Sequence, residues 1–183
     1  VCSSDLVERL AVRGAGDAGA TTAVGRFGPD GLAGRLDTGV FPAPRDASVV
    51  GLPGPALAVS LDGQGGFRAG SDAVMGAGQY NPSAILSEEE RWRQEATRRL
   101  LEPPPPDAKS GAGPSPAPPA VTLRRRPWIL CWCDAGPAEG WAVPEGFVER
   151  RSTVALVPLE LERTPPGTRF TIPSTFLPAR VDR

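Results

Sequence analysis

The sequence of 183 residues contains no histidine, so the side chain most often used for acid–base catalysis near neutral pH is missing. A Ser-His-Asp or Cys-His site therefore cannot be assembled from these residues. A Ser-Lys pair would need Lys109, the only lysine, which lies in a proline-rich stretch. Proton transfer is left to carboxylates, Tyr80 and cysteine. We expect no catalytic, cofactor-binding or metal-binding residues, no cofactor and no enzyme activity.

Carboxylates are the strongest remaining candidates for chemistry. Glu160 and Glu162 alternate in an apolar run and would lie roughly 6–7 Å apart on one face of a strand. That separation is within the range that glycosidases use. Alternation on a solvent-exposed face explains the same pattern without chemistry. A carboxylate-only hydrolase stays open as an alternative, and a pocket with two or more convergent carboxylates would favour it.

A glycine-rich segment matches a nucleotide-binding motif. Gly14–Gly19 reads GAGDAG, which fits G-x-G-x-x-G, and Asp37 lies downstream at a suitable distance. The mechanism needs a helix that begins at these glycines and holds the pyrophosphate at its N-terminus. Here Gly25 and the turn Gly28–Gly31 interrupt any such helix. Nucleotide binding is therefore a third and disfavoured interpretation.

Two further clusters have ordinary structural explanations. Cys131 and Cys133 would share one face of a strand, but zinc needs four ligands and the sequence offers no second pair. We interpret both as small core residues. Arg124–Arg126 beside Trp128 resembles a nucleic-acid-binding patch. Because the net charge is −1, we interpret these arginines as solvated charges at a sheet edge and expect no nucleic-acid partner.

Short apolar runs, spaced about ten residues apart, predict a mainly β fold of the β-sandwich type. Gly28–Gly31 reads GPDG and predicts a hairpin turn. Trp128–Cys133 is apolar on both faces, which predicts a central strand covered on both sides. Pro158 predicts an edge or a bulge in its own strand. The expected extended segments are Val7–Arg13, Thr21–Phe27, Leu32–Asp37, Ala47–Gly51, Ala56–Leu61, a run from Phe67, Trp128–Cys133, Thr153–Glu162 and, after a turn at 165–167, Thr168–Ile172.

One surface helix is predicted over about residues 87–102. Ser87 and Glu90 form a capping-box pattern, and Pro103 ends the helix. Acidic residues fill the first turn and arginines the last, which suits the helix dipole. An apolar stripe of Trp92, Ala96 and Leu100 is narrow and indicates a helix lying on a sheet surface. Two favourable i,i+4 pairs are expected, Glu89–Arg93 and Glu95–Arg99.

The remaining segments define the predicted organisation. Val1–Leu6 reads VCSSDL, which is also the translation of the end of a common sequencing adapter, so we exclude it from the fold. Residues 103–120 should form a disordered proline-rich linker, and its P-x-x-P spacing could alternatively serve an SH3-like partner. Strands in 7–102 and 121–183 are expected to complete one β domain. Two small β units joined by the linker are the alternative.

Three stretches together carry a resemblance. They are GRFGPDGLAGRLDTGVFPAPRDASVVG (25–51), RPWILCWCDAG (126–136) and STVALVPLELERTPPGTRFTIPSTFLP (152–178). They resemble an uncharacterised extracytoplasmic β domain of large membrane proteins from GC-rich bacteria. The resemblance implies a membrane-tethered parent with spanning helices outside this chain, other domains of that parent as partners, and no catalytic residue. We therefore expect a non-catalytic interaction or scaffold module on the extracytoplasmic face of a bacterial membrane.

Overall fold

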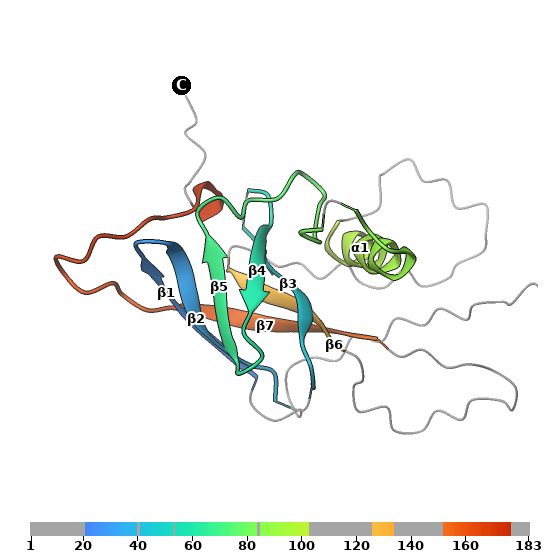
Figure 1. Ribbon diagram of the computed structural model, residues 1–183, viewed down its shortest axis with the longest axis horizontal. Helices are drawn as coiled ribbons and strands as arrows, with labels where there is room; N and C mark the ends of the chain where they lie inside the picture. The colour runs from blue at the N-terminus through green and yellow to red at the C-terminus, as the bar shows by residue number, and fades with distance from the viewer. Residues whose placement is uncertain are drawn as a thin grey trace, which may run out of the picture.

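The computed structural model describes residues 21–39, 41–52, 54–83, 85–102, 126–133 and 152–176 (Figure 1). Within these ranges the chain forms seven strands, one α-helix and a short 3-10 turn, η1 (Ser174–Phe176). The helix is α1 (Glu88–Leu101). The strands are β1 (Thr22–Gly28), β2 (Gly31–Asp37), β3 (Arg45–Val50), β4 (Leu57–Leu61), β5 (Gly66–Gly70), β6 (Trp128–Cys133) and β7 (Thr153–Leu161).

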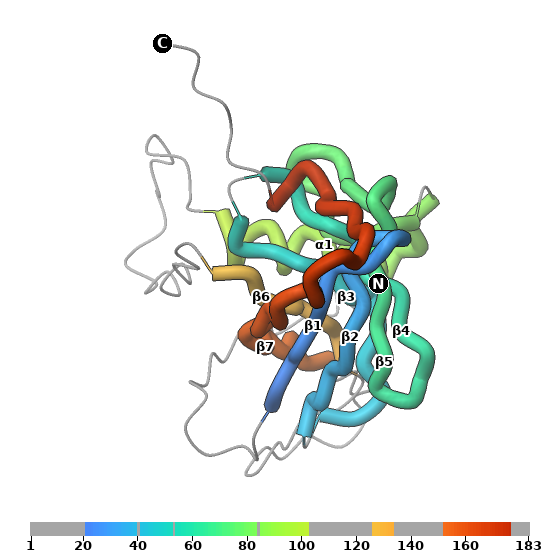
Figure 2. Tube along the Cα trace, turned by 90° about the vertical axis from the view of Figure 1, so that its left-hand side faces the viewer, coloured from blue at the N-terminus to red at the C-terminus, as the bar shows by residue number. Residues whose placement is uncertain are grey.

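The seven strands close into a barrel in the order β1-β2-β5-β4-β3-β6-β7. Neighbouring strands are antiparallel except β1 and β7, which run parallel and lie side by side in Figure 2. The mainly β prediction is confirmed, but the predicted sandwich is wrong. Ala23–Gly25 pair with Leu159–Leu161, and this contact joins strands that would be free edges in a sandwich. Barrels and sandwiches share the same inside–outside alternation along each strand, so the sequence pattern does not separate them.

The predicted hairpin between β1 and β2 is confirmed, with Gly28 paired to Gly31 across the turn. Gly31 has a φ of 116°, and a Cβ there would lie 2.4 Å from the backbone oxygen of Ala69. Only glycine fits such a position. The other predicted strands among the described residues, except residues 168–172, agree to within about two residues, the usual uncertainty of strand ends. Val7–Arg13 lies outside the described residues.

Residues 168–172 do not form the extended strand expected of them. After the turn in which Thr168 N–H donates to Pro165 O at 3.2 Å, the chain runs back across the end of the β1–β2 hairpin (Figure 2). There the Thr171 N–H donates to Gly28 O at 2.9 Å and its hydroxyl donates to Pro29 O at 2.8 Å. Because these bonds go to the last residue of β1 and to the turn that follows it, no ladder forms.

The barrel interior is filled with apolar side chains. Phe67 is the largest fully buried residue, and its ring covers Gly25 and Gly34 on the facing strands. A Cβ at Gly34 would lie 2.8 Å from that ring and 2.0 Å from the backbone oxygen of Val24. Large side chains therefore face small ones, as close packing inside a small barrel requires. The other interior residues include Leu32, Leu36, Val49, Leu57, Ile129, Cys131, Cys133, Val157 and Leu159.

The outer wall of β3 and β6 is also apolar. Val50, Leu130 and Trp132 point outward and form a second buried cluster with residues of α1. The predicted two-sided burial of β6 is thus confirmed, since Ile129–Cys133 are all buried. Because β6 pairs with β3, strands from before and after residues 103–125 share one barrel.

β7 as a whole is not an edge strand, because it lies between β6 and β1 in the closed barrel, but Pro158 has a ladder partner on its β6 side alone. It is paired with Trp128 at the end of the β6–β7 ladder, and pairing with β1 begins at the next residue, Leu159. Proline is tolerated where the strand changes partner, because a missing backbone donor at the end of a ladder costs few bonds.

The helix prediction is confirmed, with one correction to its buried face. The capping box is present, because Glu90 N–H donates to Ser87 Oγ at 3.2 Å and Ser87 N–H donates to Glu90 Oε2 at 2.7 Å. Both predicted i,i+4 ion pairs form. The buried residues, however, are Arg93, Thr97 and Leu100, while Trp92 keeps 37% of its surface exposed. The helix is therefore rotated relative to the predicted apolar stripe.

Candidate functional site

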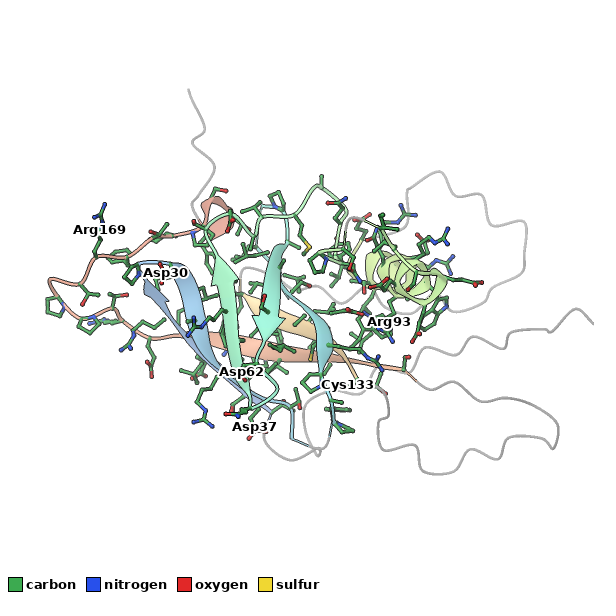
Figure 3. All side chains as sticks on the ribbon, viewed as in Figure 1. Asp30, Asp37, Asp62, Arg93, Cys133 and Arg169 are labelled. Carbon is green, nitrogen blue, oxygen red and sulfur yellow. The ribbon has the colours of Figure 1, made fainter. Side chains whose placement is uncertain are left out.

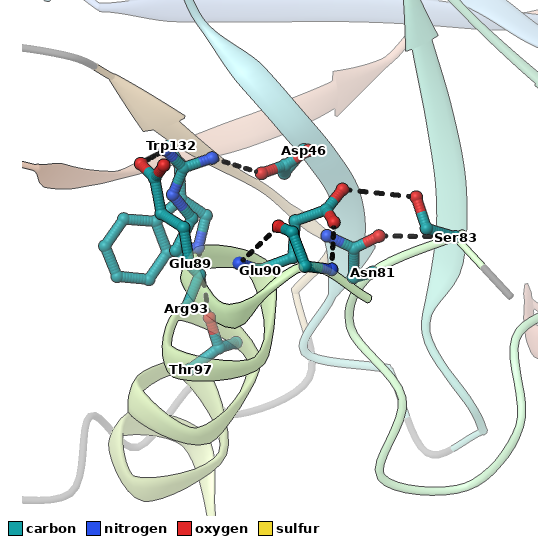
Figure 4. Close-up of polar contacts among 9 residues, drawn as sticks. Asp46, Asn81, Ser83, Glu89, Glu90, Arg93, Thr97 and Trp132 are labelled. Atoms are coloured by element: carbon teal, nitrogen blue, oxygen red, sulfur yellow. Dashed lines mark hydrogen bonds and ion pairs between the residues drawn. The ribbon is translucent and has the colours of Figure 1, made fainter. Parts of the chain in front are cut away.

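The tightest polar cluster lies between α1 and the barrel wall (Figure 4). The Arg93 side chain is only 5% exposed, and its Nη1 donates to Asp46 Oδ2 at 2.6 Å. Its Nη2 donates to Glu89, and the guanidinium carbon lies 5.9 Å from the centre of the Trp132 ring. Asp46 has a φ of 47° and lies at a register shift of β3, which aims its carboxylate at the helix.

Because of this cluster, Arg93 and Thr97 face the barrel, and the helix is turned relative to the orientation that its apolar stripe predicts. A charged guanidinium can be buried only when it is paired, and the irregularity in β3 supplies the partner. One turn further along, Trp132 Nε1 donates to Thr97 Oγ1 at 3.3 Å, and the Trp92 and Trp132 rings lie 5.5 Å apart. Because these groups hydrogen-bond or pack against one another, we interpret the cluster as the attachment of the helix to the barrel.

Tyr80, a candidate for proton transfer, is tied to the helix end. Its hydroxyl donates to Glu102 Oε1 at 3.1 Å. Burial and this neighbouring carboxylate raise the pKa of Tyr80 to about 12. The phenol is therefore protonated at neutral pH and is a poor general base there.

The two cysteines lie in the barrel core, as predicted. Cys131 and Cys133 are both free and buried among the interior residues. The hydrogen bond with Cys133, together with burial, raises the pKa of Cys131, so this thiol is inert as a nucleophile. Within the described ranges, no three cysteine, aspartate or glutamate side chains gather closely enough to hold a metal ion.

An open hollow of about 920 Å³ lies on the outer wall of the β1–β2 hairpin. Small residues of the two strands, among them Ala33 and Gly34, form its floor. Polar side chains surround them, and the charged ones are Arg26, Arg35, Asp37 and Glu162. Outward positions on β1 and β2 supply both arginines, since inward positions carry the core.

The carboxylates of the hollow do not converge. Asp37 pairs with Thr22 at one end of β1, whereas Glu162 N–H donates to Gly25 O and lies on the far side of that strand. Strand spacings place their Cα atoms roughly 14 Å apart on opposite sides of β1, whereas the carboxyl groups of an inverting glycosidase pair lie at most roughly 9.5 Å apart. Figure 3 shows Asp37 and Asp62 at one end of the barrel and Asp30 at the other.

The carboxylate pair expected from the sequence, Glu160 and Glu162, is divided as well. Glu160 Oε1 lies 3.5 Å from Arg126 Nη2, and both side chains are more than half exposed. Glu162 borders the hollow, whereas Glu160 is not part of its lining. Arg126 thus forms an exposed ion pair, while Arg124 and Arg125 lie outside the described residues. Gly14–Gly19 and Lys109 also fall outside them, so the nucleotide-binding and Ser-Lys interpretations rest on the sequence alone.

Sequence reasoning overlooked the arginines of the hollow. Arg26 and Arg35 stand at outward positions of the hairpin whose turn, Gly28–Gly31, the sequence does predict. Counting back from that turn places Arg26 opposite Ala33 and Arg35 opposite Val24. The register of a hairpin follows from its turn, so this neighbourhood could have been found from the sequence.

Comparisons with protein-family models, with curated proteins and with solved structures found no match. In the part of the chain that the structure describes, no helix is both long and apolar enough to span a membrane.

Proposed function

We propose that this chain is a non-catalytic interaction or scaffold module of an exported or membrane-tethered bacterial protein. The observation that carries the proposal is the filled barrel interior, where Phe67 and its neighbours leave contacts with other molecules to the outer surface. The groups best suited to chemistry are occupied or apart: Tyr80 is bonded to Glu102, the cysteines are buried, and the carboxylates of the hollow are separated. The extracytoplasmic location rests on the sequence resemblance alone.

The test of the interaction role uses the complete parent protein and compares two triple variants. One replaces three exposed arginines on the outer wall of β1, β2 and β5, called the open wall below, by glutamate: Arg26, Arg35 and Arg68. The other replaces Arg91, Arg98 and Arg99 on the helix by glutamate, which changes the net charge equally. We expect the first variant to lose association with the other domains or subunits of the parent protein. Both variants should keep the circular dichroism spectrum of the unchanged protein. Equal association of both variants would argue against a contact role for this wall.

A second experiment addresses the hydrolase alternative. Asp37→Asn and Glu162→Gln are assayed with chromogenic glycoside and ester substrates beside the unchanged chain. We expect no turnover that depends on either carboxylate, because the two are too far apart to act together. Turnover by the unchanged chain that both variants abolish would overturn the non-catalytic proposal.

The location can be tested separately by fusing alkaline phosphatase to the C-terminus of the domain in its parent protein. This reporter needs disulfides and is active only in an oxidising compartment. An active fusion is expected. An inactive fusion with a normal protein level would place the domain in the cytoplasm.

A further inference from the structure

Three arginines gather on the outer wall of β1, β2 and β5. The strand register puts Arg26 opposite Ala33 and Ala33 opposite Arg68, so these three residues form one row across the sheet. Arg35 lies two residues along β2 from Ala33 and therefore on the same outward face. Cross-strand spacings place the row ends roughly 10 Å apart and each diagonal to Arg35 roughly 7–8 Å apart.

None of the three arginines forms an ion pair with a carboxylate of the described residues. Neither the ion pairs nor the hydrogen bonds of the barrel wall include Arg26, Arg35 or Arg68. Like charges at such close range repel one another unless something lies between them. All three side chains are exposed, which leaves their guanidinium groups free to converge on a ligand.

Most of the surrounding carboxylates have partners of their own. Asp37 Oδ1 accepts the Gly39 N–H at 2.8 Å. Asp62 Oδ1 accepts two backbone N–H groups at 2.8 Å, those of Gln64 and Gly66. These bonds and, more weakly, the positive charge of Arg35 lower the pKa of Asp62. Glu160 faces Arg126. Glu162 is the neighbouring acid whose side chain makes no such contact, and it borders the hollow on the β7 side of Arg26.

The shape of the hollow favours a compact ligand over a base or a helix. The floor is made of small residues such as Ala33 and Gly34, so a group can approach the backbone between the arginines. Phe27 also borders the hollow, but its ring packs edge-on against Phe176 at 5.1 Å. Phe27 is the one aromatic residue of the lining, so the hollow lacks the series of aromatic faces on which successive bases of single-stranded nucleic acid would stack.

We propose that this hollow binds a phosphate-type oxyanion through Arg26 and Arg35 of its lining, joined by Arg68, which lies beside the lining on β5, opposite Ala33. Three guanidinium forks around one centre match a tetrahedral group that carries three outer oxygens and nearly two negative charges. A carboxylate has only two oxygens and would satisfy two forks. The same chemistry is found in a soluble phosphomonoester and in a phospholipid headgroup. The inference names the ligand of the open wall and rests on the proposed role of that wall as the contact surface.

The experiment titrates the purified 183-residue chain with inorganic phosphate, with chloride adjusted to constant ionic strength, and follows backbone amide NMR signals. We expect saturable shifts confined to residues 22–38 and 62–70. Arg26→Gln with Arg35→Gln should weaken binding about tenfold to 25-fold, since each exposed charge pair contributes about threefold to fivefold. Arg68→Gln should weaken it about threefold to fivefold. The matched control, Arg98→Gln with Arg99→Gln on the helix, should leave it unchanged.

Two further arms separate the sources of phosphate. Binding to vesicles with phosphatidic acid but not to phosphatidylcholine vesicles, again lost in the double variant, indicates a headgroup. Binding of glycerol phosphate without vesicle binding indicates a soluble ligand. Linear, unsaturated shifts, or equal weakening in the helix control, would reveal an adventitious ion only and overturn the proposal. If phosphate fails but the arginine-to-glutamate variant of the parent still loses its association, the interaction role stands and the ligand is a protein.

Discussion

Replacing Arg93 by alanine should detach α1 from the barrel at a measurable free-energy cost. Arg93 donates to Asp46 and Glu89 and is 5% exposed. Breaking a fully buried pair costs about 3–5 kcal/mol. Asp46 is 21% exposed and Glu89 54%, so water takes over part of the lost interaction in the variant. We therefore expect Arg93→Ala to lower the free energy of unfolding by about 2–3 kcal/mol.

The assay is urea unfolding followed by tryptophan fluorescence. The fluorescence reports on the contact between α1 and the barrel, because Trp92 and Trp132 both lie in that contact. Arg98→Ala is the control on the same helix. Its ion pair with Glu95 is 2.8 Å long but 53% and 41% exposed, so its loss should cost less than about 0.5 kcal/mol. A double-mutant cycle with Asp46→Ala should give a coupling energy of about 1–2 kcal/mol.

Equal losses for Arg93→Ala and Arg98→Ala would refute this reasoning. So would a coupling energy near zero between Asp46 and Arg93, because the helix would then be held by apolar contacts alone. A lower m-value in Arg93→Ala, with the midpoint kept, would instead indicate that the helix is already detached in the folded state.

Three other outcomes are expected. Gly34→Ala should destabilise the barrel by about 3 kcal/mol or more in the same urea assay, because the alanine Cβ would lie 2.0 Å from the backbone oxygen of Val24. A loss below about 1 kcal/mol would show that β1 and β2 separate easily at this position. Tyr80 is the only tyrosine, so absorbance at 295 nm should report its pKa, which is about 12 and should move toward 10 in Glu102→Gln. Because the pKa of Tyr80 is raised in the folded state, the stability that the protonated phenol contributes is complete below pH 10 and is lost as the pH rises through 12. Deleting residues 1–6 should leave the thermal midpoint unchanged, and a loss above about 1 kcal/mol would show that they belong to the fold.

Local signals made part of this fold predictable. The turn Gly28–Gly31 and the capping box of Ser87 and Glu90 each lie within four consecutive residues, and the structure contains both. The two-faced burial of Trp128–Cys133 also follows from composition alone. In these cases the residues that determine the structure are neighbours in sequence, so no knowledge of the tertiary arrangement is needed.

The closure of the barrel depends on contacts that no local pattern reveals. Only three residues of β1 pair with β7, and Ala23 meets Leu159 from the other end of the chain. The buried face of α1 was predicted only in part, for a similar reason: Leu100 is buried and Ala96 packs against the barrel, but Arg93 and Thr97 are buried as well. An apolar stripe through Trp92 is a sound expectation until a distant irregularity in β3 offers a carboxylate to Arg93. In both cases a long-range partner outweighs the local periodicity.

The position of the candidate interaction surface follows from what the rest of the described chain already covers. The interior is filled, and α1 lies over the outward side of β3 and β6. Residues 164–171 bond to the β1–β2 turn and occupy that end of the barrel. The outer wall of β1, β2 and β5 has no such cover in the described ranges, and its outward residues are small or charged. A wall selected only for solubility would intersperse both signs of charge. Here three arginines stand together, and of the two acids that line the hollow, Asp37 accepts a backbone N–H while Glu162 makes no such contact. This cluster of three guanidinium groups is the physical reason to expect an anion on this wall.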